Sequence, residues 1–209
     1  MESEDSSEQV AFMKQKLGEL AQKAKLGKAP DIWISKNERF ASVNVFLKRI
    51  SVGEYFLSLW KQGKFSDDDV EATLAHEVGH LMDFRRDSSS YSFRNLFVES
   101  LWFSFGVVPL VIYLLAPAAE YFLLAAVLTV GWGFSIPFVV RHVEVRIEFE
   151  ADKKATKLVA PQQLANALTK ISAFAASAKT LGLMARLSFL AGTLTHPSFT
   201  ERVRNLRCP

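Results

Sequence analysis

The sequence predicts a mainly helical α+β fold with a small antiparallel sheet, interrupted by a transmembrane helical hairpin. Three observations lead to this fold class. Long stretches have helical periodicity, strand-forming runs are confined to about residues 32–56, and two long uncharged stretches lie in mid-chain. With 209 residues, the chain can form one modest domain with an insertion. A composition of 49% hydrophobic and 22% charged residues excludes wholesale disorder.

The N-terminal part of the chain predicts a helix and then the sheet. Residues 1–8 are acidic and serine-rich, unlike a secretory signal, and we expect them to form a disordered acidic tail. From Gln9 to about Leu26, apolar residues recur at helical spacing, and a glycine and a proline end this helix. Three runs of strand-forming residues then predict the antiparallel sheet, at 32–34, 40–47 and about 50–56.

A second helix is predicted to begin at Ser66. This serine can cap the helix, Asp69 lies three residues later as in a capping box, and acidic residues favour the positive helix end. The helix then continues towards residue 85 and includes the sequence His-Glu-Val-Gly-His at residues 76–80.

Two uncharged stretches follow, Ser100–Ala119 and Tyr121–Val140, each 20 residues long. A bilayer core about 30 Å thick needs roughly 20 apolar residues in a helix. The stretches therefore predict a transmembrane hairpin at about 97–140, inserted into a domain that covers 9–209. The alternative is a pair of helices buried in a soluble core, but so small a domain could hardly cover them.

Basic residues flank the hairpin on both sides, whereas its turn at Ala116–Glu120 has none. By the positive-inside rule, both termini and the active site are expected in the cytoplasm. The predicted localisation is therefore an integral protein of the cell or inner membrane with two spans. Two further helices are expected after the hairpin, over about 141–159 and from Pro161.

Charge and cysteine content exclude other classes of protein. The net charge is only +3 and no basic block accompanies stacking aromatics, so no nucleic-acid partner is expected. Cys208 is the only cysteine of the sequence, which excludes a disulfide framework within the chain.

The pattern at residues 76–80 indicates a metal site. Four residues apart on a helix, His76 and His80 project from one face and can bind one zinc ion. Glu77 lies beside them and can take a proton from zinc-bound water, whose pKa the metal lowers towards about 7. The alternative is a helix with two solvated histidines, and the well-capped helix around the pattern argues against it.

The third zinc ligand is expected from the helix after the hairpin. A catalytic zinc usually has three protein ligands and one open position. Glu144, Glu148 and Asp152 share one face of this helix, and spacing alone does not choose between the two glutamates. An aspartate one turn after a ligand can orient a ligating histidine. A solvated acidic face would be the simpler interpretation if the histidine pattern were missing.

The order of these features resembles the membrane gluzincin zinc metallopeptidase family that includes HtpX and the CAAX-prenyl endopeptidase. The resemblance rests on the HExxH pattern, the apolar hairpin, Glu-Phe-Glu-Ala-Asp at 148–152 and Thr-His-Pro at 195–197, and runs from about Asp31 to Leu206. It implies a zincin-like metallopeptidase domain with one Zn²⁺ per chain.

The same resemblance assigns residues to roles. It implies that His76, His80 and Glu148 hold the zinc and that Asp152 supports them. It also implies that His196 and Arg202 lie near the active site, where they donate to the tetrahedral oxyanion or hold the carboxylates.

In the family that this chain resembles, the substrate pairs as an added strand with a strand beside the HExxH helix. Ser42, Val43 and Asn44 occupy the equivalent place, and backbone pairing gives affinity with little sequence preference. The expected partners are an extended polypeptide and the lipid bilayer. Fewer spans are predicted here than in HtpX or the prenyl-protein enzyme. Prenylated substrates are therefore disfavoured, while membrane-protein quality control and a narrower regulatory cleavage stay open.

The sequence therefore predicts a membrane-anchored zinc endopeptidase that hydrolyses unfolded or membrane proteins at the cytoplasmic face. Glu77 is expected to act as general base and then as general acid. One alternative is an intramembrane protease, which the charged segment of about 20 residues between HExxH and the first span disfavours. Another is a latent enzyme or non-enzymatic scaffold that keeps the zincin fold. The intact Glu77 argues against a pure scaffold.

Overall fold

A computed structural model describes residues 2–36, 38–82, 111, 114, 126–127, 141, 144–177 and 197–207. Two helical segments carry the predicted site, and we name them the HExxH helix (residues 67–82) and the Glu148 helix (residues 144–155). The other elements are α1 (Glu2–Lys23), β1 (Asp31–Ser35), β2 (Ala41–Asn44), β3 (Arg49–Gly53), α2 (Glu54–Lys61), α5 (Pro161–Ser177) and α7 (Phe199–Arg207). The described part is thus mainly helical, as expected for the fold class.

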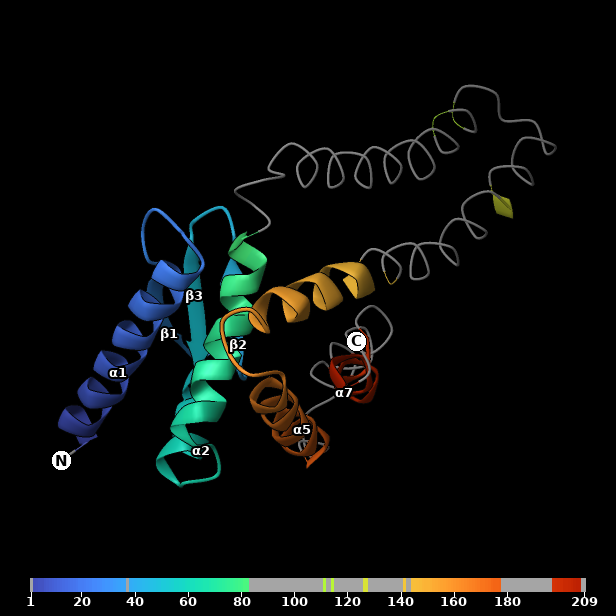
Figure 1. The fold of residues 1–209 in the computed structure, drawn as a ribbon. Coiled ribbons are helices and arrows are strands. Elements are labelled where there is room, and N and C mark those ends of the chain that lie inside the picture. Colours follow the sequence, from blue (N-terminus) through green and yellow to red (C-terminus); the bar gives the residue numbers. More distant parts are fainter. Residues whose placement is uncertain are drawn as a thin grey trace.

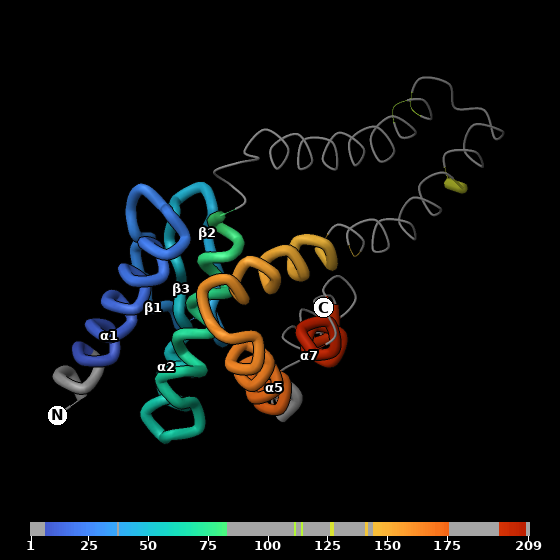
Figure 2. Tube along the Cα trace, in the orientation of Figure 1, coloured from blue at the N-terminus to red at the C-terminus, as the bar shows by residue number. Residues whose placement is uncertain are grey.

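The HExxH helix runs through the middle of the molecule (Figure 1). On one side of it lie α1 and the sheet, and on the other lie the Glu148 helix, α5 and α7. Figure 2 shows that α7, close to the C-terminus, returns to lie beside α5, and the two helices are in contact. Segments far apart in the sequence therefore meet around the centre of one helix.

The described strands form one mixed sheet in the order β1-β3-β2, not the antiparallel sheet that the sequence predicts. β2 pairs with β3 antiparallel, because the turn between them is short and Lys48 takes a positive φ of 48° there. β1 lies on the other edge of β3 and runs parallel to it. Strand propensity locates these segments but does not encode their relative direction, which explains the wrong prediction.

The third predicted strand, at about 50–56, contains a helix start. β3 ends at Gly53, and α2 begins at Glu54 and buries Phe56, Leu57 and Leu59. A Cβ on Gly53 would overlap the backbone of Glu38, so only a glycine lets these two segments of the chain pass so close to each other. The aromatic and aliphatic residues of α2 therefore give a strand-like composition to a short buried helix.

The hydrophobic core packs the HExxH helix against α1, the sheet and α2, and it extends to α5. Met13, Leu17 and Leu20 of α1 are almost completely buried, as are Leu74 and Val78 of the HExxH helix. Burying a side chain of this size contributes roughly 1.5–3 kcal/mol, so this face of the HExxH helix is held firmly. The opposite face is left to carry polar residues.

Helix α1 begins at Glu2, earlier than the predicted start at Gln9. Residues 2–8 are thus helical in the structure, whereas the sequence predicted a disordered tail. Acidic residues at a helix N-terminus interact favourably with the helix dipole, which is consistent with this longer helix.

The capping box predicted at the start of the HExxH helix is confirmed. The backbone N–H and the hydroxyl of Ser66 both donate to Asp69 Oδ2, each over 2.7 Å, and the Asp69 N–H donates back to Ser66 Oγ over 3.3 Å. Lys170 of α5 also contacts Asp69 Oδ2. We name Ser66, Asp69 and Lys170 the cap cluster.

No helix in the described part of the chain combines the length and the apolar character needed to cross a bilayer. Helix α1 has 22 residues, for example, but charged side chains are spread along it. The predicted transmembrane hairpin at about 97–140 and the predicted integral-membrane localisation with two spans are corrected by this finding. Of the predicted hairpin, residues 111, 114, 126 and 127 are described and the others lie outside the described residues.

Candidate metal centre

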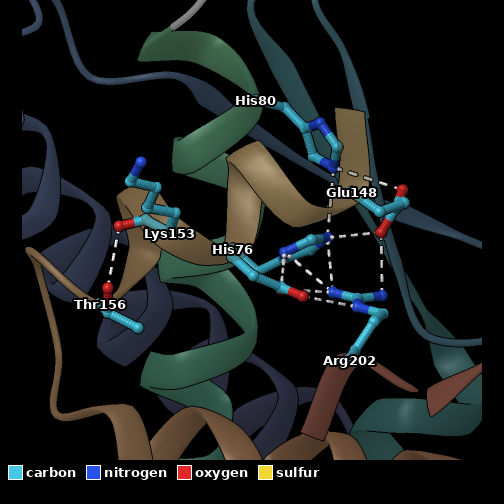
Figure 3. Close-up of polar contacts among 7 residues, drawn as sticks. His76, His80, Glu148, Lys153, Thr156 and Arg202 are labelled. Atoms are coloured by element: carbon cyan, nitrogen blue, oxygen red, sulfur yellow. Dashed lines mark hydrogen bonds and ion pairs between the residues drawn. The ribbon is translucent and has the colours of Figure 1, made fainter. Parts of the chain in front are cut away.

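The polar face of the HExxH helix presents two histidines to the Glu148 helix (Figure 3). The Nε2 atoms of His76 and His80 are 3.2 Å apart, as expected for residues one turn apart on one face. Glu148 faces both rings. Its Oε2 lies 3.3 Å from His76 Nε2, and its Oε1 lies 3.7 Å from His80 Nε2. Two imidazoles and one carboxylate therefore converge on one point.

These three side chains fit a zinc ion. Zinc bonds to nitrogen and oxygen are about 2.0–2.2 Å long, so two ligands of a tetrahedral zinc lie about 3.4 Å apart. The separations here range from 3.2 to 3.7 Å. Among the described residues, His76, His80 and Glu148 form the group of acidic and histidine side chains that could hold a metal ion. Two histidines and one glutamate are also a ligand set of catalytic zinc.

Asp152 and Arg202 hold this group from behind. Asp152 Oδ1 lies 3.0 Å from His76 Nδ1, the ring nitrogen that faces away from His80. Arg202 donates to both Asp152 oxygens, over 2.7 and 2.8 Å, and its Nη1 lies 2.9 Å from Glu148 Oε2. We name Glu148, Asp152 and Arg202 the buried cluster, since each is less than a tenth exposed.

The opposed charges determine the protonation states of the buried cluster. Burial raises the pKa of Glu148, but the hydrogen bond with His76 and the charge of Arg202 outweigh it and hold this pKa below its ordinary value. Burial raises the pKa of Asp152 as well, but its hydrogen bonds with His76 and Arg202 outweigh burial and lower this pKa. Both carboxylates are therefore ionised at neutral pH, as a metal ligand and its support should be.

The two histidines differ in protonation. Burial and the charge of Arg202 lower the pKa of His76, but hydrogen bonds to Asp152 and Glu148 outweigh them and raise it to about 9. Burial and the charge of His76 lower the pKa of His80 to about 3. A metal ion that binds both rings must displace the His76 proton, so its affinity should rise with pH.

Glu77 is buried beside the metal ligands. Burial and the negative charge of Glu148 raise its pKa to about 7, against the charges of His76 and Arg202. A carboxyl group with such a pKa can accept and return a proton at neutral pH. The charge of Glu38, which precedes β2 in the chain, also raises this pKa. Sequence reasoning missed Glu38, because no motif links it to HExxH.

A comparison with protein-family models identifies the chain's relatives. The model of peptidase family M48 matches residues 7–209. The chain belongs to peptidase family M48. Membership supports a metallopeptidase, and the His-His-Glu group provides the place where an M48 enzyme would bind its metal. A search of curated proteins found none that matches the chain.

The M48 assignment confirms the predicted family at the level of gluzincin metallopeptidases, while membership of the HtpX or the CAAX-prenyl branch stays a prediction. The structure brings His76, His80, Glu148, Asp152 and Arg202 together, and it leaves Glu144, the other possible ligand, out of the metal-binding group.

The remaining predicted site residues stay predictions. His196 lies outside the described residues. Ser42, Val43 and Asn44 lie on β2, which is an outer strand of the described sheet.

Proposed function

We propose that this M48 protein is a zinc-dependent endopeptidase that hydrolyses peptide bonds of unfolded polypeptides bound in extended form. The observation that carries the proposal is the meeting of His76, His80 and Glu148 from two helices, with the buried carboxyl group of Glu77 beside them. A scaffold would need neither this donor set nor a carboxyl group with a pKa near neutrality.

His76, His80 and Glu148 would hold one zinc ion. When bound, zinc supplies a Lewis acid that polarises the scissile carbonyl and lowers the pKa of a water molecule from about 15.7 towards 7. Asp152 Oδ1, 3.0 Å from His76 Nδ1, would accept the Nδ1 proton and so leave Nε2 as the ring nitrogen that binds the metal.

Glu77 moves the proton in the proposed reaction. As a carboxylate it accepts a proton from the attacking water, and as a carboxylic acid it returns that proton to the nitrogen of the leaving amine. Its pKa of about 7 makes both transfers accessible near neutral pH. The new C–O bond forms first, and the C–N bond breaks once the nitrogen has received the proton from Glu77.

The proposed role of Arg202 is to hold the carboxylates. Its guanidinium already donates to Asp152 through two nitrogens and faces Glu148 with a third. These contacts favour this role over donation to an oxyanion. Stabilisation of the oxyanion by His196 remains part of the proposal that rests on the family resemblance.

The proposed substrate site is the outer edge of β2. This strand pairs with β3 on one side, and a peptide could add as a further strand on the other. Ser42, Val43 and Asn44 would then pair through their backbones. A polypeptide must be locally unfolded to pair in this way, so unfolded polypeptides are the proposed substrates.

Proteolysis of casein by the zinc-loaded protein tests the function. The Glu77→Gln variant removes the base at nearly constant shape, and Glu71→Gln is a matched control on the same helix, where Glu71 pairs with Lys16 at 3.1 Å. We expect the wild type and Glu71→Gln to cleave, and Glu77→Gln to be slower by about 10²–10⁴-fold with its zinc retained. Equal rates for wild type and Glu77→Gln would refute the assigned role. Zinc binding without cleavage by any of the three would favour the latent enzyme or the scaffold.

A further inference from the structure

The HExxH helix packs tightly against the backbone of the Glu148 helix at Gly79. This residue is buried between Val78 and His80. A Cβ added to Gly79 would lie 2.5 Å from the carbonyl oxygen of Ala151 and 3.2 Å from both its Cα and its carbonyl carbon. All three are backbone atoms, so no side-chain rotation can relieve the overlap.

This contact joins residues that are close to the metal ligands in both helices. Gly79 precedes His80, and Ala151 precedes Asp152 in the helix that carries Glu148. To restore an ordinary contact of 3.4 Å, the two helices would have to move apart by about 0.9 Å. Zinc–ligand bonds are about 2.0–2.2 Å long and tolerate deviations of only about 0.2 Å. A shift of this size would therefore withdraw the Glu148 carboxylate from a metal held by His76 and His80.

We propose that Gly79 is a positioning residue for the third metal ligand. Its lack of a side chain sets the spacing between the HExxH helix and the Glu148 helix, and this spacing puts Glu148 within bonding distance of the metal. The inference rests on the proposed metal site and deepens it. It does not depend on catalysis by Glu77.

Zinc affinity of a Gly79→Ala variant tests the inference, measured by competition with a chelating indicator. Gly18→Ala is the matched control. Gly18 is also a helical glycine, but a Cβ there meets no atom within 4 Å. Both changes gain the same helix propensity. We expect Gly18→Ala to keep wild-type affinity and to raise the unfolding temperature by about 2–4 °C. We expect Gly79→Ala to bind zinc at least about tenfold more weakly.

A double-mutant cycle with Glu148→Ala separates positioning from general loosening of the structure. If Gly79 acts through Glu148, the Gly79→Ala change should lower zinc affinity by less than about twofold once Glu148 is gone. An equal loss with and without Glu148 would overturn the inference, as would wild-type affinity of the single Gly79→Ala variant. A wild type that binds no zinc would instead overturn the proposed function together with this inference.

The crystal structure of the zinc-loaded wild type provides a second test if Gly79→Ala does not fold. We expect this structure to show Gly79 in contact with the Ala151 backbone and Glu148 bound to zinc. A gap at Gly79 wide enough for a methyl group, with Glu148 still bound, would overturn it.

Discussion

Two clusters of opposite charges join helices in this protein, and they differ in depth. In the cap cluster, Lys170 lies 2.5 Å from Asp69, and the lysine side chain is 42% exposed. In the buried cluster, Arg202 lies 2.7 Å from Asp152, and the two side chains are 8% and 1% exposed. The first cluster completes the start of the HExxH helix, and the second supports the metal ligands at its middle.

The difference in exposure changes what each cluster contributes. Lys170 remains partly hydrated, so its pairing with Asp69 contributes little. Without Lys170, Asp69 would still accept two hydrogen bonds from Ser66. Arg202 is buried away from water, and without it two buried carboxylates would share the imidazolium of His76 as their remaining cation among the described contacts. The same chemical pairing is thus a replaceable stabiliser at the helix start and an indispensable support at the site.

The largest expected effect comes from Arg202→Met. We expect the free energy of unfolding to fall by about 3–5 kcal/mol, because Glu148 and Asp152 lose the buried guanidinium that contacts them both. Urea denaturation in the presence of a chelator measures this value. Arg204→Met, an exposed position on the same helix α7, is the control and should change it by less than about 0.5 kcal/mol. Equal stabilities of the two variants would remove the distinction between the clusters.

Asp152→Asn sharpens the comparison at the metal. An amide still fills the space but orients His76 less well and bears no charge. We therefore expect zinc affinity to fall by about 10–100-fold. The matched change in the cap cluster, Asp69→Asn, should leave zinc affinity as in the wild type. A similar loss in both variants would show that zinc affinity follows overall stability and not the contact with His76.

Lys170→Met should have a small effect. The pair with Asp69 is partly solvated, so we expect a loss of no more than about 1 kcal/mol in the free energy of unfolding. Zinc affinity should not change. A loss as large as that of Arg202→Met, measured in the same denaturation series, would contradict this view of the cap cluster.

The pH dependence of Asp69 gives the smallest effect. Burial raises its pKa, but hydrogen bonds with Lys170 and Ser66 outweigh it, so the folded pKa lies below the unfolded value of about 3.9. The ionised form therefore stabilises the fold fully above about pH 4, and this contribution disappears as the pH falls through the folded pKa. The stability difference between wild type and Asp69→Asn should stay constant from pH 7 to pH 5 and shrink below about pH 4. A difference that shrinks already above pH 5 would contradict it.

Local features of this protein could be predicted from sequence because they depend on spacing along one helix. The capping box at Ser66 and the shared face of His76 and His80 follow from the 3.6-residue period alone. Spacing left the choice between Glu144 and Glu148 open, because it depends on how a second helix packs. The contact of Gly79 with Ala151 depends on the same packing, and no sequence pattern reports it.

Predictions that required relations between segments were less successful. The residues of β1 and β3 indicate strands, but their parallel pairing depends on the path of the chain between them. The strand predicted through Phe56 was wrong because apolar composition fits a buried helix as well as a strand. The transmembrane hairpin was predicted from the length of two uncharged stretches, and no described helix supports it.

The central claim is that Glu148, together with His76 and His80, holds one zinc ion. The direct test is the zinc bound per chain, measured by native mass spectrometry for the wild type, Glu148→Ala and Glu144→Ala at one limiting zinc concentration. We predict one zinc in the wild type and in Glu144→Ala, and loss of the metal in Glu148→Ala. Full zinc in Glu148→Ala with loss in Glu144→Ala would contradict the account.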